Sequence, residues 1–553
     1  MNQSALRSSQ RARARDRPTQ ASFYPAADRR SVLDRAHRGD IIGAFGRVAQ
    51  VDTAPRRSLG RRLATLLAVM GPGIVVMVAD NDAGGISTYA QVGQDHGLGL
   101  LWLVVVLAGV LFVNQEMVSR LGAVTGAGHA RLIYERFGRH WGGFALVDLL
   151  LVNFLLIVTQ FIGVGFALSY FGVSRYISIP LAALALIAFP ITGSFRRWER
   201  AMYVLVALSL VAVPLVVLAH HAMPAAAVAS GHHVGRGPVL VIVALIGTTV
   251  PAWQLFFQQS NVVDKRITSR WIPYERADTI VGTVLFAVGA AAALITCAFA
   301  FDGTALHGAY VNAGILVNEL AHQVGVWGGA FFAVFLFNGS VLGAGAVTLS
   351  TSYALGDATG TKHSLHRSWR DARRFHGSYA LLVALAGTIV LLPGIRLGIV
   401  TTGVQVLAGV LLPSALVFLV LLCNDRAVLG PWTNPRWLNA IVGAIVATCL
   451  VLSGLLVIAT VFHPMTGRPP VLLSAVGGAM GLGALAGWQL SDDAGAPRRL
   501  RDERTSWSMP RIESLPPPPT SRARTFWLIV LRAYLLLAAV AVIVKVIGLL
   551  VGP

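Results

Sequence analysis

The chain has 553 residues, of which 55% are hydrophobic and only 13% are charged, and its mean hydropathy is +0.66. That balance excludes a soluble globular protein, because a globule of this size could not bury so much apolar surface. The only cysteines, Cys297, Cys423 and Cys449, all lie in or beside apolar segments, so neither a disulfide framework nor a cysteine metal cluster is supported. The composition therefore predicts a polytopic membrane protein.

Residues 1–60 form the first predicted element. They are rich in Arg, Ser, Ala and Asp and contain no apolar run long enough to build a core. We expect a disordered basic tail on the cytoplasmic side. For residues 31–47, the alternative to a disordered tail is a short amphipathic helix at the anionic inner leaflet of the membrane.

About 13 later segments are long enough to cross the roughly 30 Å of hydrocarbon in a bilayer. They cover approximately residues 63–94, 98–119, 142–170, 176–194, 199–219, 238–261, 279–301, 324–355, 377–395, 398–423, 437–462, 470–489 and 525–551. We expect a main membrane domain over residues 61–462, an additional span over 463–490, a cytoplasmic linker over 491–524 with a stiff proline run, and a terminal span over 525–553.

The basic charge alternates between the predicted loops. A net charge of +20 would suggest a nucleic-acid partner for a soluble protein, so its distribution decides the matter. All 45 Lys and Arg residues except six lie in the tail, the linker or every second loop, and the exceptions are Arg175, Arg236, Arg396, Arg468, Arg532 and Lys545. This distribution is a positive-inside signal, which predicts a cytoplasmic N-terminus and argues against nucleic-acid binding.

The first and sixth segments are both interrupted. Residues 79–85 read ADNDAGG, and residues 248–254 read TTVPAWQ. Gly84 and Gly85 permit backbone geometry that larger residues resist, and Pro251 lacks the amide donor that a continuous helix needs. Spans one to five and six to ten would then form two halves that each begin with a discontinuous helix. This plan predicts an all-α membrane protein with the inverted five-helix repeat of LeuT-type transporters.

Asp80 and Asp82 lie at the first break, where a carboxylate costs roughly 2.5–3.5 kcal/mol on insertion scales. Two roles offset that cost: an N-cap of the following half-helix, or a hard oxygen ligand for a cation. Both roles stay open for Asp80, whereas the adjoining glycines favour the ligand role for Asp82. Backbone oxygens freed at Gly85 and Thr249 complete a candidate metal site. Trp253 lies beside the second break, where it either limits the size of the cavity or is an ordinary packed aromatic.

Residues 71–93, which read GPGIVVMVADNDAGGISTYAQVG, resemble the first helix of the Nramp divalent-metal transporters. The family's hallmark there is Asp-Pro-Gly-Asn, and the matching residues are Asp82, Ala83, Gly84 and Gly85. Further similarity lies in residues 120–126 (RLGAVTG), residues 404–413 (VQVLAGVLLP) and residues 424–426 (NDR). The resemblance covers about residues 60–460 and implies a divalent-metal transporter with an ion site at Asp82.

The resemblance also identifies ligands that this chain lacks. The hallmark Asn is replaced by Gly85, and the family's sixth-helix pattern Met-Pro-His-Asn-Leu-Tyr-Leu-His aligns with residues 251–258, PAWQLFFQ. Without the soft thioether, the site contains only oxygen ligands, which suit a hard ion such as Mg²⁺. The pattern is similar to that of the Nramp-related magnesium transporters. Gln405 matches a tenth-helix Gln that joins the ion in the family, and it is either a second-tier ligand or a helix–helix hydrogen bond.

The proton route of the family is altered as well. The third-helix carboxylates that accompany proton coupling align with Ile157 and Gln160, and the sixth-helix His aligns with Gln258. Asp148 is either a displaced relay or a polar residue near the cytoplasmic end of its helix. Coupling is unnecessary in energetic terms, because inward movement of a divalent ion yields about 4.6 kcal/mol per 100 mV, twice the single-charge value.

We therefore expect a secondary transporter that moves a divalent metal ion, Mg²⁺ in preference to Mn²⁺, into the cytoplasm by voltage-driven alternating access. The alternatives are a proton-coupled Mn²⁺/Fe²⁺ importer and an organic-solute carrier on the same scaffold. No phosphate loop, nucleophile elbow or His-Glu-x-x-His motif favours an enzyme, and no cofactor is expected besides the transported ion. The expected partners are the metal ion and the lipid bilayer, and the expected location is a bacterial cytoplasmic membrane.

Overall fold

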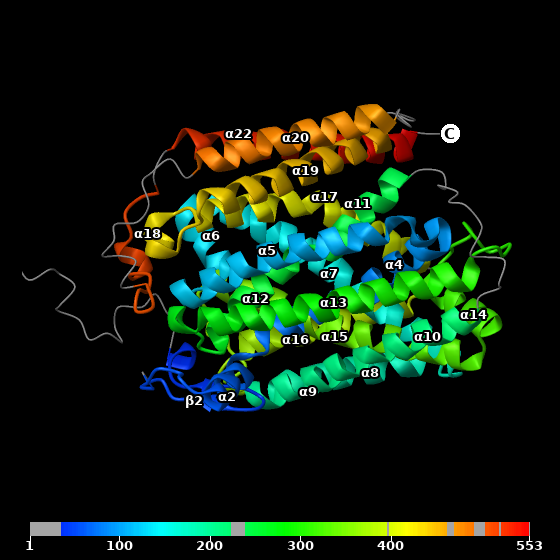
Figure 1. Cartoon of the computed structure of the whole chain (residues 1–553), viewed down its shortest axis with the longest axis horizontal. Coiled ribbons are helices and arrows are strands. Elements are labelled where there is room, and N and C mark those ends of the chain that lie inside the picture. Colours follow the sequence, from blue (N-terminus) through cyan, green and yellow to red (C-terminus); the bar gives the residue numbers. More distant parts are fainter. Residues whose placement is uncertain are drawn as a thin grey trace, which may run out of the picture.

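The computed structural model describes residues 35–52, 54–222, 238–394, 397–461, 469–490, 504–518 and 521–551. Helices running side by side make up most of this part of the chain (Figure 1). The longer helices are α5 (Leu101–Thr125), α7 (Arg139–Tyr170), α8 (Arg175–Ile191), α9 (Phe195–Leu208), α13 (Ile272–Phe301), α15 (Val326–Thr359), α16 (Arg373–Leu391), α17 (Leu397–Cys423), α19 (Arg436–Val461), α20 (Pro469–Gln489) and α22 (Arg522–Val551). The predicted helical class is confirmed.

Shorter elements complete the bundle. The short α-helices are α2 (Leu59–Val69), α6 (His129–Phe137), α10 (Ala212–Ala222), α14 (Ala313–Val324) and α18 (Arg426–Leu429). The 3-10 turns are η3 (Arg35–His37), η4 (Gly97–Leu100), η5 (Ser209–Val211), η7 (Ser269–Trp271), η8 (Gly430–Trp432) and η9 (Ile512–Ser514). An antiparallel pair, β1 (Ile41–Ile42) and β2 (Arg47–Val48), lies near the start of the described chain.

Both predicted helix breaks are present. The first segment divides into α3 (Pro72–Val78) and α4 (Ala83–His96), and the sixth divides into α11 (Pro238–Thr249) and α12 (Ala252–Asp264). The first break leaves Ala79–Asp82 outside helical structure, and the second leaves Val250 and Pro251 outside it. The discontinuous first and sixth helices are therefore confirmed.

The predicted number of about 13 spans is not confirmed. Eight helical stretches of the described chain are long and apolar enough to cross a membrane, or nine if the bent pair α2 and α3 counts as one span. One reason lies in the sixth predicted span, because the break leaves α11 with 12 residues and α12 with 13. Helix α8, with 17 residues, also falls short of the usual 20.

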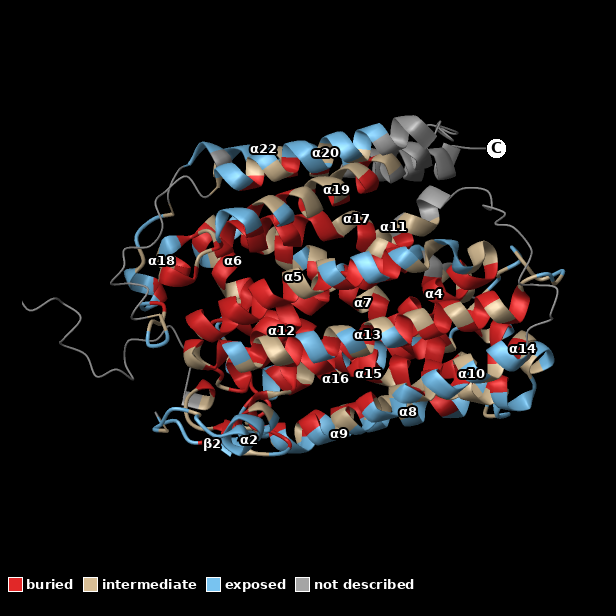
Figure 2. Cartoon of the chain, in the orientation of Figure 1, coloured by how far each residue is buried: buried red, intermediate tan, exposed pale blue. Residues whose placement is uncertain are grey.

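Buried residues line the inner faces of the bundle, and exposed ones follow its outer helices, including α8, α9, α14 and α22 (Figure 2). The elements β2, α2, α6 and α18 gather at one end of the bundle, and α14 lies at the other (Figure 1). We call the first of these the basic end, because its loops and helix starts expose arginines, among them Arg57, Arg61, Arg62, Arg139, Arg196, Arg197, Arg373 and Arg374. The positive-inside pattern predicts that this end is cytoplasmic.

The N-terminal segment differs from the predicted disordered tail. Residues 1–34 lie outside the described residues, but from Arg35 the chain folds against the basic end, and residues 35–47 contain no α-helix. The amide of Ala44 donates to the buried Glu199 carboxylate on α9, and Arg200 donates to the Ala44 carbonyl at 3.1 Å. On the side of the N-terminal segment, both contacts are made by the backbone of Ala44, and amino-acid composition gives no information about backbone hydrogen bonds.

The described part of the predicted linker also packs against the basic end. Met509 is fully buried, and its amide donates to the carbonyl of Val124 at 3.1 Å. The hydroxyl of Ser269 donates to the carbonyls of Thr505 and Trp507 at 3.1 and 2.9 Å. Residues 504–518 are thus a docked strap rather than a free spacer.

The backbones of α19 and α20 meet along a seam of glycines. A Cβ built on Gly443 would lie 2.1 Å from the carbonyl oxygen of Gly483, and one on Gly487 would lie 2.0 Å from that of Asn439. Only glycine permits such an approach, which is the small-residue packing typical of membrane helices. We call Gly443, Gly483 and Gly487 the glycine seam.

Candidate ion site at the two helix breaks

Asp82 begins the second half of the first interrupted helix. Its Oδ1 accepts a hydrogen bond from the Gly85 amide at 2.7 Å, which makes it the N-cap of α4. Its Oδ2 accepts from Nε2 of Gln160 on α7 at 2.6 Å, and Oε1 of Gln160 accepts the Ala83 amide at 3.0 Å. One neutral amide thus holds both the carboxylate and the first turn of α4. The side chain of Asp82 is 5% exposed, so this arrangement is buried.

Asp80 is not the cap. Its side chain is 1% exposed, and Oδ2 has no hydrogen-bond partner among the described residues. Oδ1 of Asn81 likewise has no donor there, while its Nδ2 donates to the Phe286 carbonyl of α13 at 3.1 Å. Buried acceptors without donors are costly. Their presence at the break is the feature of this structure that best fits a cation.

Glycines let α15 and α17 approach the first break closely. A Cβ on Gly343 of α15 would lie 2.7 Å from the Cβ of Asp82, and one on Gly84 would lie 1.6 Å from Nε2 of Gln405 on α17. A Cβ on Gly85 would lie 2.5 Å from the Asp80 carbonyl oxygen. The small residues at 84 and 85 therefore serve close packing as well as the turn.

The second break meets the first through hydroxyl groups at the end of α11. Thr248 Oγ1 donates to Oε1 of Gln405 at 3.0 Å, and Gln405 in turn lies against Gly84. Thr249 Oγ1 donates to the Leu245 carbonyl at 2.8 Å and lies 3.1 Å from the Tyr89 hydroxyl of α4. Asp82, Gly85, Gln405 and Thr249 are therefore brought to one region, although they come from three helices.

Trp253 is placed differently. It is fully buried in α12, its carbonyl accepts from Ser350 of α15 at 2.8 Å, and its ring lies 6.0 Å from that of Phe257. These contacts are those of an ordinary packed aromatic, and none of them connects Trp253 to Asp82. Its indole Nε1 has no acceptor among the described residues.

Asp148 lies apart from the breaks. Its Oδ2 accepts from Ser414 of α17 at 2.7 Å, and it lines a cavity of about 10 Å³ that Ala252 and Phe256 of α12 also line. Twelve residues separate it from Gln160 on α7, which is about 18 Å along the helix. It does not contact the Asp82 carboxylate.

Sequence reasoning missed three participants: Gln160, Thr248 and Tyr89. Gln160 was noted only as a residue that cannot titrate, although a buried amide opposite a buried Asp is a natural partner. Thr248 opens the interrupted stretch at residues 248–254, next to the predicted Thr249, and that position was its signal. Tyr89 has no signal in the sequence that separates it from other hydroxyl residues in apolar helices. No group of three or more His, Cys, Asp or Glu in the described chain could enclose a metal, so a cation at the breaks would need carbonyls or water as well.

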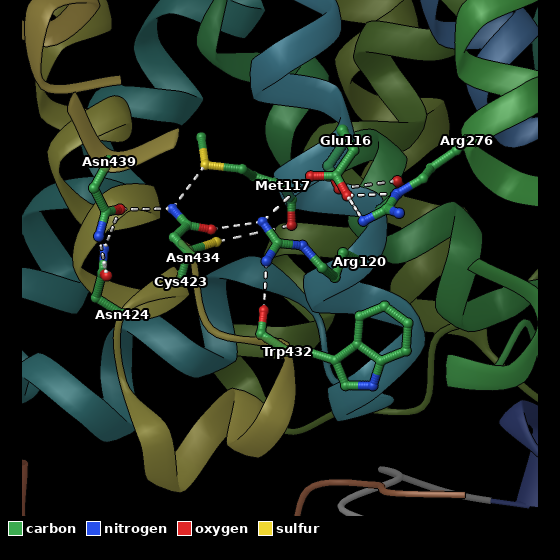
Figure 3. A network of polar contacts seen from close by, with 10 residues as sticks. Glu116, Met117, Arg120, Arg276, Cys423, Asn424, Trp432, Asn434 and Asn439 are labelled. Carbon is green, nitrogen blue, oxygen red and sulfur yellow. Dashed lines mark hydrogen bonds and ion pairs between the residues drawn. The ribbon is translucent and has the colours of Figure 1, made fainter. Parts of the chain in front are cut away.

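A second polar network ties the ends of α5 and α17 together (Figure 3). Arg120 donates to Oδ1 of Asn434 at 2.6 Å and to the Trp432 carbonyl, and it pairs with Glu116 at 3.2 Å. Glu116 also pairs with Arg276 of α13 at 2.6 Å. Through Arg120, this network connects residues 120–126, the RLGAVTG stretch noted in the sequence, to the segment that follows α17.

Comparison with known proteins gives a consistent result. A family model described as natural resistance-associated macrophage protein-like (Nramp) matches residues 73–459. The divalent metal cation transporter MntH 1 of Pseudomonas aeruginosa is 29% identical over 402 residues, which is 68% of this chain and 88% of that protein. The MntH of Bacillus subtilis is 22% identical over 411 residues, or 71% and 93% of the two chains. A crystal structure of the Eremococcus coleocola manganese transporter in complex with an aromatic bis-isothiourea substituted compound has the same fold, with a TM-score of 0.60 at 20% identity over 80% of this chain and 96% of that one.

Proposed function

The chain belongs to the Nramp family, and from this premise we propose that it is a secondary transporter that carries a divalent metal ion into the cytoplasm by alternating access. The membrane would be a bacterial cytoplasmic membrane, with the basic end inside. Mg²⁺ is the favoured ion and Mn²⁺ the second.

The observation that carries the proposal is the pair of carboxylates at the first break. Asp82 is buried and held by Gln160, and Asp80 has a buried oxygen without a donor. A carboxylate oxygen that accepts one hydrogen bond keeps a lone pair for a cation. Two such groups beside broken helix ends supply hard oxygen ligands of the kind that a small, strongly hydrated divalent ion prefers.

The ligand set supports Mg²⁺ because sulfur is missing from the residues that face one another at the breaks. The aligned thioether position is Pro251, and Met77 on α3 directs its sulfur toward the Thr283 hydroxyl of α13, 3.9 Å away. Soft ligands favour Mn²⁺ and Fe²⁺ over Mg²⁺, so an all-oxygen site loses that preference.

Voltage alone supplies the driving force in this proposal. Gln160, which holds Asp82, cannot release a proton near pH 7. Entry of a divalent ion yields about 4.6 kcal/mol per 100 mV, which sustains a gradient of roughly 10³-fold. A gradient of this size therefore requires no proton coupling.

The second candidate is a proton-coupled Mn²⁺/Fe²⁺ importer. It is favoured by the relatives, which are named as divalent metal cation and manganese transporters. An organic-solute carrier is the third, and it has only the general scaffold in its favour.

One flux experiment separates the three. Protein reconstituted into vesicles with a clamped potential is offered Mg²⁺, Mn²⁺ or Ca²⁺ while an internal dye reports pH. We expect Mg²⁺ and Mn²⁺ uptake that grows with an inside-negative potential, no acidification, and loss of uptake in Asp82→Ala. A proton signal that follows Mn²⁺ while Mg²⁺ stays outside would favour the second candidate, and no divalent flux at all would leave the third.

A further inference from the structure

Helix α2, which directly precedes the first interrupted helix, has two faces of opposite character. Thr65, Ala68 and Val69 are buried against the bundle. Leu59, Leu63 and Leu67 are 72%, 50% and 44% exposed. Their spacing of four residues places these leucines on one stripe, on the side of the helix turned away from the buried residues.

The inner face of α2 is already occupied. Cβ atoms built on Gly43 and Gly46 would lie 2.2 Å from the Ala68 carbonyl oxygen and 3.0 Å from the Ala68 Cβ, so the β1–β2 hairpin packs directly on this helix. Arg56 Nε donates to the Thr65 hydroxyl at 2.8 Å on the same side. The described chain therefore fixes how α2 is oriented, and it leaves the leucine stripe uncovered.

Unpaired positive charge surrounds the first turn of α2. Arg57, Arg61 and Arg62 are exposed, and none of them forms an ion pair within the described residues, whereas the neighbouring Arg56 pairs with Asp52 at 2.8 Å. No acidic residue lies in the first turn of α2. Cations at a helix N-terminus oppose the helix dipole, so their placement there is unfavourable unless an external negative charge compensates.

Exposed leucines beside uncompensated arginines are complementary to one surface, the boundary between the headgroups and acyl chains of an anionic leaflet. We propose that α2 docks on the anionic lipids of the leaflet at the basic end, with the leucine stripe in the acyl boundary and Arg57, Arg61 and Arg62 at the phosphates. The 54° bend between α2 and α3 agrees with this, since α2 leaves the path of the helix that leads into the bundle.

Docking has a consequence for transport, which rests on the proposed function. Only Met70 and Gly71 separate α2 from α3, and α3 ends at the break that holds Asp80. A lipid anchor on α2 therefore fixes one end of the half-helix that leads to the candidate ion site.

Spin labelling of the full-length protein tests the docking directly. A nitroxide on Leu63→Cys is measured in vesicles of phosphatidylcholine alone and in vesicles that also contain phosphatidylglycerol. The three native cysteines are buried, so the unsubstituted protein serves as the labelling blank. We expect the label to be accessible to oxygen and protected from a water-soluble nickel reagent, with more protection when phosphatidylglycerol is present. A label exposed to water in both vesicles would overturn the proposal, as would one coupled to a label in a second copy of the chain.

Charge neutralisation provides the matched comparison. Arg61→Gln/Arg62→Gln removes two arginines beside the leucine stripe, while Arg373→Gln/Arg374→Gln removes an exposed pair at the start of α16 on the same end. We expect the ratio of lipid-inserted to water-exposed label to fall about 30-fold in the first variant and to stay unchanged in the second. Equal effects of the two pairs would overturn the assignment to α2. Label depth requires no transport, so a protein with the native residues at the breaks that docks on lipid but carries no divalent ion would show failure of the proposed function alone.

Discussion

Asp82 illustrates how one side chain can serve both structure and binding. Its two oxygens accept from Gly85 and Gln160, so the residue already caps α4 before any ion arrives. An ionised carboxylate has about four lone-pair positions, and two hydrogen bonds leave room for a cation. Asp80 has no such structural task in the described chain, which makes it the clearer indicator of a ligand.

The double role of Asp82 can be separated by substitution. Asparagine is as good an N-cap as aspartate, so Asp82→Asn should keep the bond to the Gly85 amide while removing the charge. We expect a cost of about 1–3 kcal/mol in stability, because the Asn amide nitrogen cannot accept from Gln160. We expect Mg²⁺ affinity, measured by calorimetry in detergent, to fall at least tenfold in Asp82→Asn and also in Asp80→Asn. Thermal unfolding of the same samples serves as the control. Wild-type affinity in both variants would remove the carboxylates from the site.

Gln160 sets the protonation behaviour of the site in our proposal. Glutamate at this position would put a second carboxyl group 2.6 Å from the Asp82 oxygen, where one proton would be shared between the two groups. Gln160→Glu should therefore make uptake depend on pH and produce a proton signal that the wild type lacks. The matched control is Asn153→Asp, which changes another buried amide of α7, one that donates to the Thr351 hydroxyl at 2.9 Å, and it should produce no proton signal. A silent Gln160→Glu protein would argue against this site as the place of coupling.

At the scale of elements, the two breaks were predictable and the contacts across them were not. Asp, Gly and Pro within apolar segments mark broken helices because each disturbs regular backbone bonding. The sequence left the cap role open for Asp80 and favoured the ligand role for Asp82, whereas Asp82 is the cap in the structure, since the answer depends on which amide each side chain reaches. The partner Gln160 lies 78 residues away from Asp82 and has no local signal. The N-terminal segment was misjudged for the same reason, because Ala44 docks through its backbone.

The junction between α4 and α17 should be sensitive to a single methyl group. Gly84→Ala would place a Cβ where Gln405 now lies, and the side chain would have to move away from Thr248. We expect a loss of about 1–3 kcal/mol in stability, as for other overpacked positions, together with weaker ion binding. Gly109→Ala on α5, where a Cβ meets nothing within 4 Å, is the control, and it should leave ion binding unchanged and stability equal or up to about 1 kcal/mol higher. Unfolding midpoints and calorimetric affinities would show the difference.

At the scale of the whole molecule, the bundle is asymmetric from end to end. The N-terminal hairpin and the strap of residues 504–518 both pack against the basic end, and their partners include Glu199, Val124 and Ser269. Positive charge in alternate loops predicted which end would be distinctive. It could not predict that these polar segments fold there, because their composition resembles that of disordered chain.

The glycine seam has a consequence for how the helices beyond the family-matched region are held. The family match stops at residue 459, yet Gly443, which receives α20, lies inside the matched region. Helix α20, which lies beyond the match, therefore packs on a helix of the family-matched region. A protein truncated after residue 461 should expose the face of α19 around Gly443 that α20 otherwise covers. Exposed faces of small residues promote the association of membrane helices. We expect the truncated protein to self-associate in mild detergent, as measured by light scattering, and Gly443→Leu to abolish that association. A monomeric truncated protein would show that the exposed face around Gly443 does not drive helix association.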